Sequence, residues 1–251
     1  MPEIYSASVM MCLLLTGSYL PGQTDGAASL HDKKVRQILP PDSALPPVLD
    51  LSNAKLSDGR ASKAWEDKFT GATGVRKISD PGTDGLGGPS SISATTTEYV
   101  GQIYALPAKN SDAVVIATPV ADRAYLSYNQ RLVYSLFALK ITEVLKGKGL
   151  NVGQELAGGQ LGGSLRFPSG HLETFLVDNC GFLGLGKQYL LFIWKPIRSD
   201  ETFVISKAYL IENGRLYSIT SGADISAVEG KPLEEVKSRV KSAIAKGIDI
   251  D

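Results

Sequence analysis

The amino-acid sequence predicts a mainly β fold, in which five or six strands form a partly open barrel. A C-terminal helix follows these strands, and a disordered N-terminal segment precedes them. Three observations lead to this prediction. Apolar and polar residues alternate between 112 and 147, an Asn-Gly pair near 213 separates two apolar runs, and an apolar stripe at helical spacing occupies residues 233–244.

The first two strands are predicted from a two-residue alternation, which is typical of a strand with one buried face. The stretch DAVVIATPV starts at Asp112 and places four residues on one face of the first strand: Val114, Ile116, Thr118 and Val120. The stretch YSLFALKITEVLKG ends at Gly147 and places Phe137, Leu139 and Ile141 on one face of the second strand. A turn at 151–155 then leads to a third strand.

Later strands are predicted from apolar runs and turn residues. Residues 189–194 are continuously apolar and indicate a buried central strand. Asn213-Gly214 lies between two apolar runs and predicts a tight hairpin. The glycine-rich stretch GGQLGG at 158–163 predicts a bend or bulge of the sheet, and residues 164–175 predict a hairpin.

The C-terminal helix is predicted over 232–247. Its apolar residues recur at helical spacing and form one stripe: Leu233, Val236, Val240 and Ile244. Pro232 suits the first helical position, and Gly247 suits the residue that ends the helix.

The N-terminal part is predicted to hold a signal peptide and a linker. Residues 9–15 are a short apolar run followed by small residues, which predicts a signal peptide over 1–23 and a secreted or periplasmic protein. The run carries Cys12 and is too short to span a bilayer, so no integral membrane span is expected in the mature chain. Residues 24–98 are rich in Pro, Gly and Ser and predict a flexible linker. The β-barrel domain with its helix then covers 99–251.

Composition excludes several functions. The chain has no net charge, and 112–217 hold eleven Lys or Arg against nine Asp or Glu, so no nucleic-acid partner is expected. With two cysteines and two histidines, we expect no disulfide framework, metal site or cofactor.

The strand motifs resemble a known family. DAVVIATPV followed by YSLFALKITEVLKG, together with GKQYLLFIW at 186–194, is similar to strands of netrin-like domains, which include the tissue inhibitors of metalloproteinases. The same elements resemble a group of uncharacterised secreted bacterial proteins. The resemblance covers 111–195 and implies a barrel like the oligonucleotide/oligosaccharide-binding (OB) fold. Metalloproteinase inhibition in that family needs an N-terminal cysteine, and this chain has no cysteine between Gly22 and Asn179.

Candidate chemistry is sparse, and we predict no catalytic residue. His171, Asp178 and Cys180 would together form a thiol triad, yet they lie on one short stretch, whereas such groups are usually brought together from separate elements. GGQLGG lacks the Lys-Ser/Thr pair of a phosphate-binding loop and precedes strand signals instead of a helix.

The candidate binding residues follow the first strand. Tyr125, Tyr128 and Arg131 lie in a predicted loop, and Tyr and Arg are frequent anchors of interfaces. The competing interpretation is a loop whose tyrosines fold back onto the barrel. We therefore expect a non-enzymatic, exported module that binds a protein or glycan. The alternative is a hydrolase or thiol enzyme that uses Cys180 and His171.

Overall fold

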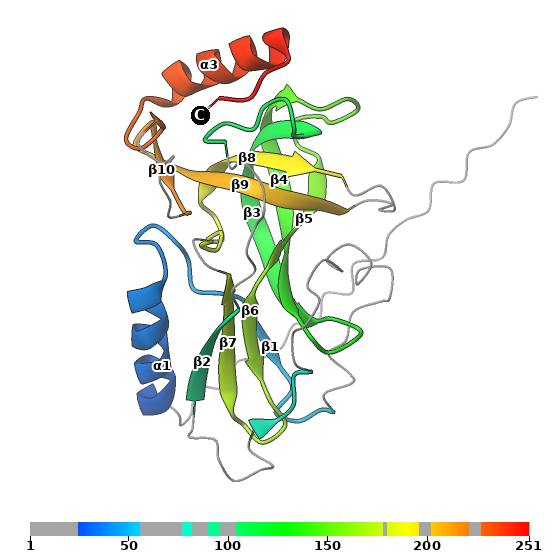
Figure 1. The fold of residues 1–251 in the computed structure, drawn as a ribbon, viewed down its shortest axis with the longest axis vertical. Helices are drawn as coiled ribbons and strands as arrows, with labels where there is room; N and C mark the ends of the chain where they lie inside the picture. The colour runs from blue at the N-terminus through cyan, green and yellow to red at the C-terminus, as the bar shows by residue number, and fades with distance from the viewer. Residues whose placement is uncertain are drawn as a thin grey trace, which may run out of the picture.

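The computed structural model describes residues 25–55, 77–81, 90–95, 104–177, 180–195, 202–220 and 227–250. This part of the chain is mainly β, as predicted, with ten strands and two helices (Figure 1). One sheet has six strands in the order β10-β9-β5-β4-β3-β8. Its strands are β3 (Ala113–Leu126), β4 (Val133–Lys146), β5 (Glu155–Leu161), β8 (Gln188–Trp194), β9 (Thr202–Glu212) and β10 (Arg215–Ser218).

Five strands of this sheet close into a ring. β8 pairs with β3 on one side and with β9 on the other, so the order β3-β4-β5-β9-β8 returns to β3. The β5–β9 pairing is parallel and joins Ala157–Gly159 to Thr202–Val204, whereas the other four pairings are antiparallel. The predicted central strand is confirmed, because β8 is buried along most of its length between two neighbours.

Both faces of the ring are packed. One apolar cluster takes residues from all five strands and therefore fills the interior: Val115, Leu139, Leu156, Leu191 and Leu210 are members. A second cluster lies on the outer face under α3 (Leu233–Lys246), and there Val114 and Ile116 pack with Val236 and Val240.

The sequence predicts that four alternate residues of the first strand share one face. This prediction is correct only at the N-terminal end of β3. Val114 and Ile116 share a face, but Thr118 is half-buried and Val120 is exposed. The β3–β4 register shifts after Ile116 and again near Val120, and each bulge turns the following residues to a different side.

The C-terminal elements follow the prediction closely. Asn213 (φ 50°) and Gly214 (φ 71°) form the tight turn between β9 and β10. α3 begins at Leu233, one residue later than predicted, and Gly247 ends it in the left-handed conformation. In Figure 1 it lies above β8 and β9.

A glycine marks the place where the chain leaves the ring. Gly162 has φ +97° and separates β5 from β6 (Gly163–Arg166), which belongs to the second sheet. A Cβ atom at Gly162 would lie 2.8 Å from Phe182 Cζ and 2.9 Å from the carbonyl oxygen of Phe175. The predicted bend at the glycine-rich stretch is confirmed.

The second sheet corrects the linker prediction. Its order is β1-β6-β7-β2, with β1 (Val48–Asp50), β7 (Leu172–Val177) and β2 (Ser90–Thr95). β6 and β7 form the predicted hairpin, but β1 and β2 come from the segment predicted as linker and pair in parallel with β6 and β7.

The helix α1 (Asp25–Ile38) also arises from the predicted linker. Where its side chains are described, α1 buries His31 and Val35, and Leu39, the residue directly after the helix, is also buried. About one residue per turn is therefore buried, which makes a narrow stripe. The linker prediction is therefore wrong for 25–55 and 90–95, because so narrow a stripe and such short strands give little periodicity. The predicted signal peptide at 1–23 lies outside the described residues. In the described part, no helix is long and apolar enough to cross a membrane.

Candidate functional site

The end of the β3–β4 hairpin extends beyond the ring. Each strand has 14 residues, whereas β8 accompanies β3 only as far as Ala117. Beyond this point the hairpin packs on the second sheet, where Leu126 and Val133 share a core with Leu49 and Leu165. Figure 1 shows β3 and β4 running from the ring toward β1 and β6. The second sheet thus supports the far end of the hairpin.

One buried serine fixes the turn at this end. The Ser127 hydroxyl accepts hydrogen bonds from the backbone N–H groups of Arg131 (3.0 Å) and Leu132 (2.9 Å). The backbone N–H of Ser127 donates to the Leu132 carbonyl at 2.8 Å, and Gln130 adopts a left-handed conformation with φ 60°. The Gln130 carbonyl accepts a further bond from the N–H of Ile78. The turn is therefore held from within and from a distant segment.

The three predicted binding residues lie together, in two different environments. Tyr125 belongs to β3 and not to the loop, which corrects the prediction, because β3 continues to Leu126. Tyr128 is 47% exposed, and Arg131 is exposed beside it in the turn. The fold-back interpretation therefore applies to Tyr125, which is half-buried.

Tyr125 is part of a stack that the sequence analysis did not identify. Its ring stacks on that of Tyr134, with centroids 5.7 Å apart and an interplanar angle of 16°. The guanidinium carbon of Arg123 lies 5.2 Å from the Tyr125 ring centroid, in a cation–π arrangement. The two-residue spacing of Arg123 and Tyr125 on one strand is the signal that predicts this contact. We call Arg123, Tyr125, Tyr128 and Arg131 the hairpin tip.

The electrostatics of the hairpin tip favour a positive surface. Arg123 and Arg131 are exposed, and among the described residues neither forms an ion pair with a carboxylate. Burial raises the pKa of the nearby Asp122 carboxyl. Burial also raises the pKa of the Tyr134 phenol, and the nearby Tyr125 adds to this effect.

The candidate thiol pair is separated by a strand. His171 precedes β7 and is buried, with its ring 5.9 Å from that of Phe167. Cys180 lies beyond the other end of β7, is half-buried, and forms a backbone bridge with Thr220. The six residues of β7 span roughly 20 Å at the usual rise of a strand. The fold thus does not bring the two side chains together, and Asp178 lies outside the described residues.

The structure also describes a hollow and the glycine-rich stretch, and neither has the groups of a catalytic or phosphate-binding site. A hollow between β4, β5 and β7 is lined by Leu132, Val133, Leu161, Gly162, Phe175, Leu176 and Val177, none of which is titratable. In the described segments, no group of three or more His, Cys, Asp or Glu is arranged to hold a metal ion. The glycine-rich stretch leads from strand to strand, which differs from the strand-to-helix setting of a phosphate-binding loop.

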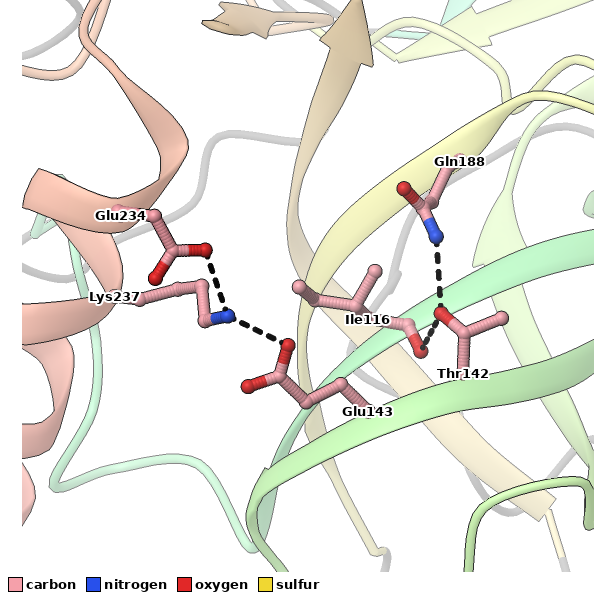
Figure 2. A network of polar contacts seen from close by, with 6 residues as sticks. All are labelled: Ile116, Thr142, Glu143, Gln188, Glu234 and Lys237. Carbon is pink, nitrogen blue, oxygen red and sulfur yellow. Dashed lines mark hydrogen bonds and ion pairs between the residues drawn. The ribbon is translucent and has the colours of Figure 1, made fainter. Parts of the chain in front are cut away.

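A polar network elsewhere joins the helix α3 to the ring (Figure 2). The Lys237 ammonium lies 2.7 Å from a Glu143 carboxylate oxygen on β4 and 3.0 Å from Glu234 on its own helix. Near this ion pair in Figure 2, the Gln188 amide donates to the exposed Thr142 hydroxyl, which donates to the Ile116 carbonyl. These contacts fix α3 and three strands, so we assign them a structural role.

Comparison of the chain with protein-family models and with curated proteins finds no match. The fold and the hairpin tip therefore describe a general class of protein, and we assign no family. The protein is mainly β, with a closed ring of five strands, a supporting second sheet and an aromatic, basic turn at the end of its longest hairpin.

Proposed function

We propose that this protein is an exported, non-enzymatic binding module with an OB-type barrel, and that the hairpin tip contacts a protein or glycan partner. The strand order of the ring supports the OB-type assignment. A meander of three strands, β3-β4-β5, joins a parallel fifth strand β9, and β8 closes the ring against β3. The OB fold is a five-stranded, partly open barrel, so this strand order supports the proposal.

The netrin-like assignment is also a proposal. The motifs that resemble netrin-like domains lie in β3, β4 and β8, which are adjacent in the ring. Motifs that are distant in sequence and adjacent in space are consistent with a shared domain. The chain nevertheless has only Cys12 and Cys180, so an inhibitory N-terminal cysteine remains unsupported.

The observation that carries the binding function is the exposure of Tyr128 on a turn that Ser127 holds rigid. Tyr offers a large contact area with few rotatable bonds, and a fixed turn loses little entropy when a partner binds. Such a preorganised side chain is typical of an interface anchor. Tyr128 has little to contribute to the core at 47% exposure.

The separation of Cys180 from His171 by β7 favours the non-enzymatic proposal over the thiol enzyme. A nucleophile and its base need hydrogen-bond reach. The thiol enzyme would require another base for Cys180, and the hollow between β4, β5 and β7 supplies no titratable group.

Site-specific cross-linking tests the proposed function. A photoreactive phenylalanine analogue replaces Tyr128 in the full chain, and cross-linked products are identified in envelope and secreted fractions of the producing cell. The same analogue at Val152, 67% exposed in the turn between β4 and β5, is the matched control. We expect one product specific to position 128. Identical products from both positions would refute the binding site.

Export is tested separately by N-terminal sequencing of the mature protein. The small residues after the apolar run predict cleavage between Gly22 and Ala28. An intact Met1 on protein purified from cytosol would refute export and leave the binding site untouched.

A further inference from the structure

We infer that the partner of the hairpin tip is a protein that presents an extended acidic peptide, with two carboxylates bound by Arg123 and Arg131. This inference rests on the proposed function and specifies the chemistry of its partner. A glycan, the other partner class considered above, and a single-stranded nucleic acid become outcomes of the test.

The charges of the hairpin tip favour an anion. Arg123 and Arg131 are exposed and lack an ion pair with any described carboxylate, unlike Arg166, which pairs with Asp50. A guanidinium binds a carboxylate through two parallel hydrogen bonds, which makes Arg suited to planar acidic groups.

Arg123 is held in place before a ligand binds. Its guanidinium lies over the Tyr125 ring, and Tyr125 is itself stacked on the buried Tyr134. The cation–π contact restricts the long side chain while its N–H groups stay available at the edge of the guanidinium plane. Restriction of this kind reduces the entropy lost on binding.

The spacing of the two arginines favours an extended chain. Arg123 and Ser127 are four residues apart along the β3 direction, a distance of about 13 Å. The backbone N–H of Arg131 donates to the Ser127 hydroxyl, so the backbone of Arg131 lies beside Ser127. Carboxylates at positions i and i+4 of an extended peptide are also about 13 Å apart and share one face.

Along the chain, Tyr125 lies between Arg123 and Ser127, and the Arg131 backbone bonds to Ser127. On an extended peptide, residue i+2 faces the same side as the two carboxylates and would meet Tyr125 or Tyr128. An apolar residue there gains contact area against a ring. The predicted recognition sequence is therefore acidic-x-apolar-x-acidic.

Direct binding to labelled peptides tests the inference. The probe is the fluorescein-labelled peptide SESLSES, and the controls are SQSLSQS and SKSLSKS, all measured by fluorescence anisotropy against the full chain. We expect SESLSES to bind most tightly and to weaken as salt is added, because both contacts are ionic. Arg123→Gln and Arg131→Gln should each reduce its affinity by about tenfold, since a hydrogen bond to a charged group is worth roughly 1.5–3 kcal/mol.

Two further variants separate recognition from general charge. Lys241→Gln removes one exposed positive charge on α3 and should leave the affinity within about twofold, since screening is nearly complete beyond a Debye length. Arg123→Lys retains the charge but loses the planar fork, and should reduce the affinity by about threefold or more. Circular dichroism of each variant verifies that the fold is retained.

Several results would overturn the inference. These are equal binding of SQSLSQS, equal losses from Lys241→Gln and Arg123→Gln, or tighter binding of a neutral oligosaccharide or of a single-stranded oligonucleotide. If SESLSES fails to bind while Tyr128 still cross-links a specific partner, the acidic-peptide inference is wrong and the proposed function stands. If both experiments fail, both are wrong.

Discussion

The Tyr125 ring stacks on the Tyr134 ring across the β3–β4 hairpin, with centroids 5.7 Å apart. The two residues are directly paired in the strand register. Tyr134 is buried and Tyr125 is half-buried, so the pair connects the interior of the hairpin to its exposed tip. Tyr125 therefore makes two contacts: its ring packs on the buried Tyr134 ring, and it also contacts the Arg123 guanidinium.

Replacing Tyr134 should change the alkaline stability of the protein. Burial raises the pKa of its phenol, whereas a tyrosine in the unfolded chain titrates near about 10. Above that pH the unfolded chain releases a proton that the folded protein keeps, so the free energy of unfolding falls as pH rises. This group alone contributes a slope of about 1.4 kcal/mol per pH unit.

We therefore expect Tyr134→Phe to flatten the loss of stability between roughly pH 10 and 12. Urea unfolding at a series of pH values measures this slope. At pH 8 neither state is ionised at this position, and the difference between wild type and variant there gives the effect of the lost hydroxyl. Parallel curves for the two proteins above pH 10 would contradict the assignment.

Gly162→Ala should destabilise the junction between the ring and the second sheet. The left-handed backbone costs about 1 kcal/mol for a residue with a side chain, and the new methyl group overlaps Phe182 and the Phe175 carbonyl. We expect a total loss of about 2–4 kcal/mol in urea unfolding. Gly170→Ala is the matched control, because Gly170 has φ +85° but open space around its Cβ position, so only about 1 kcal/mol is expected. Equal losses would show that the close approach at Gly162 has no energetic role.

Lys237 and Glu143 should show a measurable coupling energy. Their ion pair joins α3 to β4, and the Lys237 side chain is only 12% exposed. A double-mutant cycle with Lys237→Met and Glu143→Gln should give about 0.5–1 kcal/mol. Glu234→Gln should have a smaller effect, about 0.3 kcal/mol, because Glu234 is 80% exposed.

The stabilisation by the Lys237–Glu143 ion pair should also depend on pH, and its direction follows from the pKa of Lys237. The hydrogen bond to Glu143 is the main cause that raises the pKa of Lys237. The ion pair therefore stabilises the protein fully below the pKa of a lysine in the unfolded chain, about 10.4. This stabilisation is lost as the pH rises through the higher folded-state pKa of Lys237. A coupling energy that is unchanged at strongly alkaline pH would contradict this.

The sequence predicted the elements whose pattern is local. Alternation indicated β3 and β4, the turn residues Asn213-Gly214 indicated the β9–β10 hairpin, and the apolar stripe indicated α3. It did not predict α1, β1 and β2, because their order depends on partners far along the chain. β1 has three residues and is fixed by its pairing with Ser164–Arg166, which no local pattern encodes.

The candidate site was predicted in part for the same reason. The sequence placed Tyr128 and Arg131 in the loop after the first strand and left open whether the tyrosines fold back onto the barrel; in the structure both residues lie in the turn and are exposed. The sequence placed Tyr125 in the loop because β3 continues past three register shifts that interrupt its alternation. Arg123 was missed because its contact with Tyr125 depends on the strand extending that far.

Cys180→Ser should leave partner binding unchanged. Cys180 is half-buried, and β7 separates it from His171, so its thiol has no base from that residue. We expect thiol labelling to be slower in the folded protein than in urea, and the cross-linking yield at position 128 to be unaffected. Rapid labelling of the folded protein at neutral pH, with loss of an activity in the Ser variant, would favour the thiol enzyme instead.

Ser127→Ala should weaken both the turn and the binding of a partner. The Ser127 hydroxyl accepts the N–H groups of Arg131 and of the buried Leu132. Without it, the Leu132 N–H loses its acceptor, which should cost about 1–3 kcal/mol of stability in urea unfolding. A looser turn must also be ordered on binding, so the affinity for the partner should fall by about threefold or more.

Asn129→Ala separates these two effects. Asn129 is exposed, and its side-chain oxygen bonds to the Ser127 hydroxyl and the Arg131 N–H, whereas the Leu132 N–H keeps its acceptor in this variant. We expect a smaller loss of stability than for Ser127→Ala, because the Leu132 N–H keeps the Ser127 oxygen as its acceptor and only the Ser127 O–H loses one. If Ser127→Ala binds SESLSES and cross-links through position 128 as wild type does, despite its lower stability, then rigidity of the turn has no part in recognition. The exposed rings and arginines of the hairpin tip would in that case account for binding alone.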